Sequence, residues 1–109
     1  MARTFVMVSI FDKLWDDMGL SDEDLREFQN VLIENPFAGS LIQGTGGARK
    51  IRFALQGKGK SGGLRVIYFD VTHLRKIYLI ICYPKGKQDD LTPEQKKQVR
   101  KVIEAVKGV

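Results

Sequence analysis

The stretch LRVIYFDVTHLRKIYLIICYP, residues 64–84, contains two runs that are rich in β-branched and aromatic residues. The runs cover residues 64–71 and 76–83, and a tight turn is expected between them, near Thr72-His73. Two strand-like runs separated by so short a turn predict an antiparallel pair of strands. Residues 77–81 are apolar on both faces, which predicts a central strand that is covered on both sides.

Further elements are predicted on both sides of this pair. They are a strand over 4–10, a helix over 11–18, a helix from Ser21 to just before Asn35-Pro36, a glycine-rich loop over 39–47, a strand over 50–55 and a helix that begins at Thr92. The last two helices start with capping signals, at Ser21 and at Thr92-Pro93. The order βααβββα predicts an α+β fold, in which a small antiparallel sheet is packed by N-terminal helices and a C-terminal helix. A chain of 109 residues has room for a single domain, residues 1–109.

Composition limits the setting in which the protein works. No apolar run approaches the roughly 20 residues of a membrane-spanning helix, and the N-terminus lacks the pattern of a signal peptide. Cys82 is the only cysteine, so no internal disulfide can form. We therefore expect a cytoplasmic protein with no membrane partner.

The charges are strongly segregated along the chain. Residues 1–34 hold three basic and eight acidic residues, a local net charge of −5. The rest of the chain has a net charge of +10, so the net charge of the whole chain is +5. The span from Asn35 to Phe69 contains no acidic residue at all. A small domain with so basic a part suggests a polyanionic partner, of which nucleic acid is the commonest.

Several basic residues are expected at one end of the sheet. If residues 64–71 pair with 76–83, the start of one strand lies beside the end of the other, which brings Arg65 and Lys85 together with Lys58 and Lys60 of the glycine-rich segment 57–63. Arg49 lies at the far end of its own strand. The alternative is a solvated basic rim without a specific function, and the segregation of charge favours the binding site.

Other chemistry is poorly supported by the residues present. The segment 57–63 resembles two nucleotide-binding patterns, but both require a helix directly after the loop, and residues 64–69 are strand-like instead. His73 is the only histidine and is expected in an exposed turn, while Cys82 is expected to pack as a small hydrophobic residue. We predict no metal site and no cofactor.

Two segments of the chain resemble the RelE superfamily toxins of type II toxin–antitoxin systems, in particular the HigB-like branch. They are Ile42-Gln43-Gly44-Thr45-Gly46-Gly47-Ala48-Arg49-Lys50-Ile51-Arg52 and Gly57-Lys58-Gly59-Lys60-Ser61-Gly62-Gly63-Leu64-Arg65-Val66-Ile67-Tyr68. The similarity extends over nearly the whole chain, including the order of elements. It implies a ribosome-dependent endoribonuclease that cuts mRNA in the ribosomal A site without a metal. The expected partners are a cognate antitoxin, the ribosome with its 16S rRNA, and mRNA, with operator DNA reached only through the antitoxin.

The resemblance also implies roles for individual residues. Arg65 matches the family's strand arginine that holds the scissile phosphate, and Lys85, Lys58 and Lys60 match basic residues near it. Residues expected to contact mRNA or ribosomal RNA are Lys87, Arg49, Arg52 and Tyr83, and Tyr83 alternatively belongs to the core. Some family members have a tyrosine near the last helix where this chain has Leu91 and Thr92, which leaves the acid and base roles open.

Two other functions remain consistent with the same residues. One is a non-catalytic module that binds RNA or the ribosome, in which the cations only contact phosphates and binding is steeply salt-sensitive. The other is a structural protein whose basic face docks an acidic partner.

Overall fold

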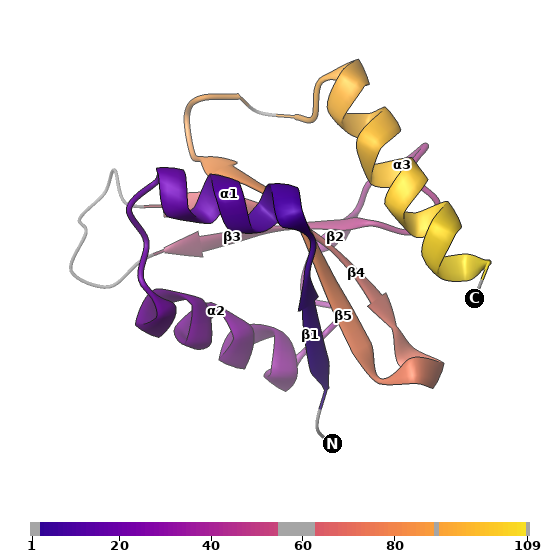
Figure 1. Cartoon of the computed structure of the whole chain (residues 1–109), viewed down its shortest axis with the longest axis horizontal. Coiled ribbons are helices and arrows are strands. Elements are labelled where there is room, and N and C mark those ends of the chain that lie inside the picture. The colour runs from indigo at the N-terminus through magenta and orange to yellow at the C-terminus, as the bar shows by residue number, and fades with distance from the viewer. Residues whose placement is uncertain (1–2, 55–62, 89, 109) are drawn as a thin grey trace.

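A mixed sheet forms the centre of the computed structural model, which describes residues 3–54, 63–88 and 90–108 (Figure 1). Within these ranges the strand order is β1-β5-β4-β3-β2. The strands are β1 Thr4–Met7, β2 Ser40–Leu41, β3 Arg49–Ala54, β4 Gly63–Val71 and β5 Lys76–Pro84. The helices are α1 Ser9–Asp17, α2 Asp22–Glu34 and α3 Pro93–Lys107. None of these helices is long and apolar enough to cross a membrane.

The predicted pair of strands at residues 64–84 is confirmed. Strands β4 and β5 are antiparallel, and a short 3₁₀ turn, Thr72–Leu74, joins them. Arg75 completes the turn in the left-handed conformation, with φ of 55°, and its N–H donates to the Thr72 carbonyl at 3.1 Å. Strand β5 lies between β1 and β4, so it is an interior strand, as its two apolar faces predicted.

The α+β class is confirmed, but the sheet is not purely antiparallel. Strand β1 pairs parallel with β5, with Thr4 opposite Lys76 and Met7 opposite Leu79. Because α1 and α2 follow β1 directly, no hairpin turn fixes its partner, and the sequence alone did not reveal its direction. A second difference is the two-residue strand β2, which forms an antiparallel edge inside the segment that was predicted to be a loop.

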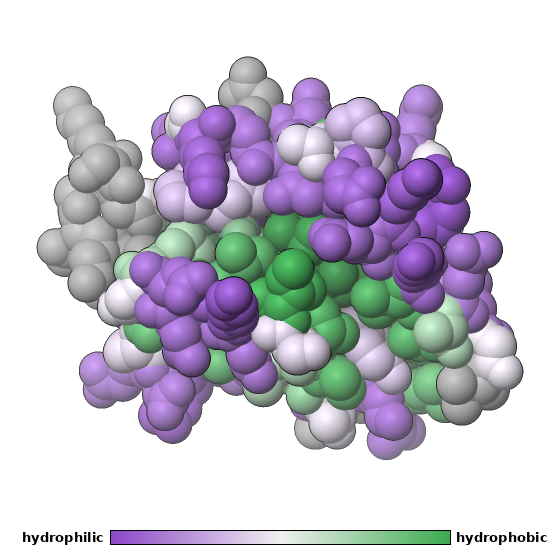
Figure 2. Space-filling model, turned by 45° about the horizontal axis from the view of Figure 1, so that its top comes forward, coloured by the Kyte–Doolittle hydropathy of each residue, from purple (hydrophilic) through white to green (hydrophobic). Residues whose placement is uncertain are grey.

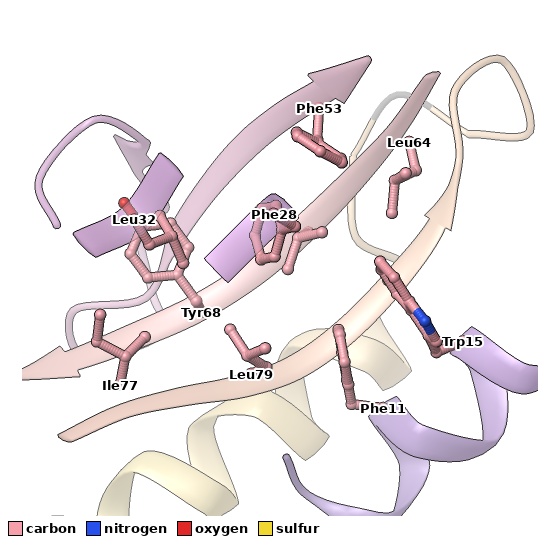
Figure 3. Packing of buried hydrophobic residues seen from close by; sticks show 11 residues of the cluster. Phe11, Trp15, Phe28, Leu32, Phe53, Leu64, Tyr68, Ile77 and Leu79 are labelled. Carbon is pink, nitrogen blue, oxygen red and sulfur yellow. The ribbon is translucent and has the colours of Figure 1, made fainter. Parts of the chain in front are cut away.

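Helices α1 and α2 cover one face of the sheet (Figures 1 and 3). Phe11 and Trp15 of α1 stack with ring centroids 5.6 Å apart, and Phe28 of α2 packs edge-on against Phe53 of β3 at 5.2 Å. Figure 3 shows these rings converging with side chains of β4 and β5. The side chains of this first core are Phe11, Trp15, Phe28, Leu32, Phe53, Leu64, Val66, Tyr68, Ile77, Leu79 and Cys82.

Helix α3 covers part of the opposite face and closes a second core. Val99 and Ile103 of the helix are buried with Ile67 of β4 and with Ile80 and Ile81 of β5. Thr92 caps the helix by accepting from the Gln95 N–H at 3.1 Å, and Gln95 in turn accepts from the Thr92 N–H at 3.0 Å. This capping box and the one at Ser21 confirm both predicted helix starts. Figure 2 shows a hydrophobic band between hydrophilic areas on this side of the molecule.

The loop between β2 and β3 is hydrogen-bonded both within itself and to α3. The buried Thr45 hydroxyl donates to the Ile42 carbonyl at 2.7 Å and accepts from the Ala48 N–H at 3.1 Å. From α3, the Arg100 guanidinium donates to the Gly44 carbonyl at 2.8 and 2.9 Å, and Lys107 donates to the Gly46 carbonyl at 2.8 Å. The glycine-rich sequence therefore shapes a loop that anchors the last helix.

Candidate nucleic-acid site

Arg65 lies in a row of polar residues across three strands. It stands opposite Arg52 of β3 and Tyr83 of β5 in the sheet register. Its chain neighbours Leu64 and Val66 point into the core beneath α1 and α2, so alternation places Arg65 on the face that α3 covers only in part. Two arginines directly across an antiparallel pair repel each other, which is the arrangement expected where an anion binds between them.

Lys85 extends over the next row on the same face. Its N–H donates to the Gly63 carbonyl at 3.0 Å, which continues the pairing of β4 and β5 beyond Pro84. A Cβ atom placed on Gly63 would lie 3.6 Å from Cδ of Lys85, so the lysine stem runs across the glycine. Because Gly63 and Arg65 are two residues apart on one strand, Lys85 lies on the same side of the sheet as Arg65.

Arg65 also has a buried hydrogen-bond donor. Its Nε atom is buried and finds no acceptor among the described residues. A buried donor without a partner costs roughly 1–3 kcal/mol, and more for a charged group. A phosphate oxygen would satisfy it with a charge-assisted hydrogen bond.

A carboxylate lies at the border of this cationic surface. Lys50 of β3 forms an ion pair with Asp90 at 2.9 Å, and the Asp90 side chain is 81% exposed. The hydrogen bond from Lys50, together with the charges of Lys50, Lys96 and Arg65, lowers the pKa of Asp90 below its usual value. Asp90 is therefore ionised at neutral pH and lies within electrostatic range of Arg65.

A hollow of about 390 Å³ opens beside this ion pair. Its walls come from β2 and the residues after it, from β3, from the approach to α3 and from the first turn of α3. The lining residues are Ser40, Leu41, Ile42, Gln43, Lys50, Asp90, Leu91 and Lys96.

The structure brings together some of the predicted residues and separates others. Arg65, Arg52 and Lys85 share one face, as just described, and Lys87 lies exposed in the turn that follows β5. Arg49 lies on the opposite face, because its neighbour in register is Tyr68 of the first core. Lys58 and Lys60 lie outside the described residues.

Two of the predicted residues, Arg49 and Tyr83, make contacts within the protein. The Arg49 guanidinium donates to the Gly39 carbonyl at 2.7 Å and to the Phe37 carbonyl at 3.3 Å, and it lies 5.3 Å from the centroid of the Phe37 ring. Tyr83 is only 3% exposed and belongs to the second core. Its ring is thus placed as a core residue, the second of the two alternatives, and has no open face on which a base can stack.

The sequence did not single out three polar residues of the hollow, Lys50, Lys96 and Asp90. Lys50 and Arg52 stand two residues apart on β3, and this spacing alone would have placed both on one face. Asp90 comes from the approach to α3 and Lys96 from the first turn of that helix, and no local pattern indicates where α3 docks.

The remaining chemically reactive side chains, Cys82 and His73, lie in the core and in an exposed turn. Burial raises the pKa of the Cys82 thiol to about 12, so Cys82 remains a protonated core residue at neutral pH. His73 lies exposed in the 3₁₀ turn, as predicted. No group of three or more metal-ligating side chains occurs in the parts of the chain that the structure covers. Residues 63–71 form a strand and not a helix, so the two nucleotide-binding patterns of segment 57–63 lack the element that they need.

Comparisons with known proteins found a matching family model and a solved structure with a similar fold. A family model described as the RelE toxin of the RelE / RelB toxin–antitoxin system matches residues 3–109. Among solved structures, a mutant of the E. coli toxin RelE in the free state has a similar fold, with a TM-score of 0.61. The two sequences are 19% identical, and the match covers 94% of this chain and 99% of that one. At this identity the structural likeness concerns the fold alone.

Proposed function

The chain belongs to the RelE toxin family of mRNA-cleaving toxins from toxin–antitoxin systems, and from this premise we propose that it cuts mRNA in the A site of translating ribosomes. It is an endoribonuclease with an antitoxin as its protein partner. Dependence on the ribosome, contact with 16S rRNA, the order of chemical steps and membership of the HigB-like branch belong to the proposal. So does the expectation that operator DNA is bound only through the antitoxin.

The proposed reaction is a transesterification within the RNA. The 2′-oxygen attacks the adjacent phosphorus, a bond forms between them, and the bond from phosphorus to the 5′-oxygen breaks. A base removes the proton of the 2′-hydroxyl and an acid gives a proton to the leaving 5′-oxygen. The products are a 2′,3′-cyclic phosphate and a 5′-hydroxyl end.

Arg65 is the residue that carries this proposal. Its buried Nε has no acceptor within the described ranges, and Arg52 and Lys85 lie on the same face. Fixed cations at this place would stabilise the negative charge that develops on the phosphate oxygens in the transition state. A single well-placed donor of this kind is worth about 10²–10³ in rate.

Other residues receive supporting roles. Lys85 shares the proton transfers with Lys58 and Lys60, which the sequence places in the segment before β4. Arg52 and the exposed Lys87 contact the RNA backbone or ribosomal RNA. Arg49 faces the other side of the sheet, so any contact it makes with ribosomal RNA is separate from the scissile bond.

The first prediction concerns Arg65→Ala. We expect this variant to lose at least a hundredfold in cleavage rate, because it removes the group that stabilises the transition state. The assay is in vitro translation of a defined mRNA with the purified protein, followed by primer extension to map the cuts. A parallel reaction contains the same mRNA without ribosomes.

Arg26→Ala provides the matched control. Arg26 is an exposed arginine on α2, in the other layer of the molecule, and its removal should leave cleavage unchanged. Full cleavage by a folded Arg65→Ala protein would contradict the assignment of the site. The absence of cuts by the wild-type protein on translating ribosomes, with salt-sensitive RNA binding intact, would instead favour a non-catalytic module.

A further inference from the structure

We propose that the hollow beside Lys50 and Asp90 receives an unstacked base of the mRNA next to the scissile phosphate, and so sets the sequence preference of the cut. The inference rests on the proposed function, since it assumes that mRNA lies across this face. It adds a base-binding subsite, with Gln43 and Asp90 as the residues that determine specificity.

The position of the hollow follows from the register of β3. Lys50 lines the hollow, and Arg52, two residues further on, stands opposite Arg65. Two residues along an antiparallel strand span about 6.8 Å. The hollow therefore lies one row away from the cations that would hold the scissile phosphate, on the same face of the sheet.

The lining has the character of a small-ligand site. Leu41, Ile42 and Leu91 supply an apolar wall, and Leu41 is 63% exposed in the free protein. The volume of about 390 Å³ falls within the range of roughly 300–1,000 Å³ that is common for ligand pockets. Sequence-specific RNA recognition usually takes bases out of the stack and reads their edges by hydrogen bonds.

The polar residues at the hollow can read such an edge. The exposed Gln43 amide offers two donors and one acceptor, the ammonium group of Lys96 offers donors, and the Asp90 carboxylate offers acceptors. The ion pair with Lys50 at 2.9 Å holds Asp90 in place while leaving most of its side chain exposed. A carboxylate has about four acceptor positions, so it can bind Lys50 and a base together.

The same carboxylate decides which part of the RNA enters. Asp90 is ionised at neutral pH, and its negative charge repels a phosphate group. Arg65, Arg52 and Lys85 form an adjoining surface of positive groups, to which the phosphates are attracted instead. The charge arrangement thus directs the backbone to the cations and a neutral base to the hollow.

The test is the base preference at the cut, measured by sequencing the 5′ ends produced during translation of a mixed mRNA pool. We expect Gln43→Ala and Asp90→Asn each to change the base frequencies at one position beside the cut by at least threefold, after normalisation to the total number of cuts. Gln98→Ala is the matched control, because Gln98 is exposed on α3 outside the hollow. It should retain the wild-type profile.

The possible outcomes separate this inference from the proposed function. Base frequencies that stay unchanged in both variants, while the wild-type protein cuts efficiently, would overturn the subsite and leave the function intact. A change spread over all positions around the cut would also overturn it, since that result indicates a general effect of charge. The absence of cuts by the wild-type protein would overturn the function and the subsite together.

Discussion

At the scale of single residues, the buried Tyr68 hydroxyl binds a segment outside its own strand. It accepts from the Gly39 N–H at 3.0 Å and donates to the Pro36 carbonyl at 2.8 Å. It thereby ties the segment between α2 and β2 to the centre of the sheet. Gly39 is itself buried, so water cannot easily replace this bond.

We therefore predict that Tyr68→Phe lowers the free energy of unfolding by about 1–3 kcal/mol, because the Gly39 N–H loses its acceptor inside the protein. Urea unfolding followed by circular dichroism measures the change. Tyr78→Phe is the control, since Tyr78 is only partly buried at the margin of the second core. Equal losses in the two variants would contradict this role of the hydroxyl.

The same tyrosine predicts a loss of stability at alkaline pH. Burial raises the pKa of Tyr68 above its ordinary value of 10.0, so the folded state favours the neutral phenol. This contribution is complete below about pH 10 and decreases as the pH rises through the higher folded-state pKa. The decrease should be smaller in Tyr68→Phe than in the wild-type protein, when both are measured by unfolding at a series of pH values.

The sequence indicated which residues of the proposed site share a face of the sheet where side chains alternate along a strand. Arg65 and Lys85 were predicted at one end of the sheet, and the register of β4 and β5 places them there. Arg49 shows the limit of this reasoning, because charge alone does not tell which face a strand residue occupies. Asp90 was missed because its importance comes from Lys50, a residue distant in sequence.

At the scale of elements, the helix starts were predictable and the edge strands were not. A capping box is a local signal over four residues, and both boxes occur where the sequence placed them. Strands β1 and β2 depend on partners elsewhere in the chain. Strand β2 has only two residues, both exposed, and therefore no hydrophobic period that could indicate it.

The capping box of α3 yields a prediction for that helix. Thr92→Ala should lower the free energy of unfolding by about 0.5–2 kcal/mol, because the Gln95 N–H loses its acceptor. Thr92→Ser keeps a hydroxyl at the same place and should retain most of the stability. If the alanine and serine variants unfold at the same urea concentration, the cap contributes nothing to stability.

At the scale of the whole molecule, charge is divided between the layers. The acidic N-terminal part forms α1 and α2 on one face of the sheet (Figure 1), whereas Arg65, Arg52 and Lys85 lie on the other face. Such a field orients the molecule as it approaches a polyanion.

This division predicts how RNA binding responds to salt. Each phosphate contact to single-stranded RNA contributes about 0.7 to the slope of log affinity against log salt concentration. Arg52→Gln should reduce the steepness by about this amount, whereas Arg26→Gln on α2 should leave it unchanged. Fluorescence anisotropy with an RNA that carries 2′-deoxy substitutions, and so resists cleavage, measures both slopes. Equal slopes for the two variants would mean that the basic face is not the binding surface.

The parallel pairing of β1 with β5 has a consequence for how the protein is made. Strand β1 is the first of the described strands to be synthesised and pairs with β5, the last of them, with Thr4 opposite Lys76. The row that contains Arg65 is completed only by Tyr83 of β5. A nascent chain that ends before β5 has neither its N-terminal strand in place nor an assembled cationic site. The cationic face is therefore complete only after β5 has been synthesised and has paired with both β1 and β4.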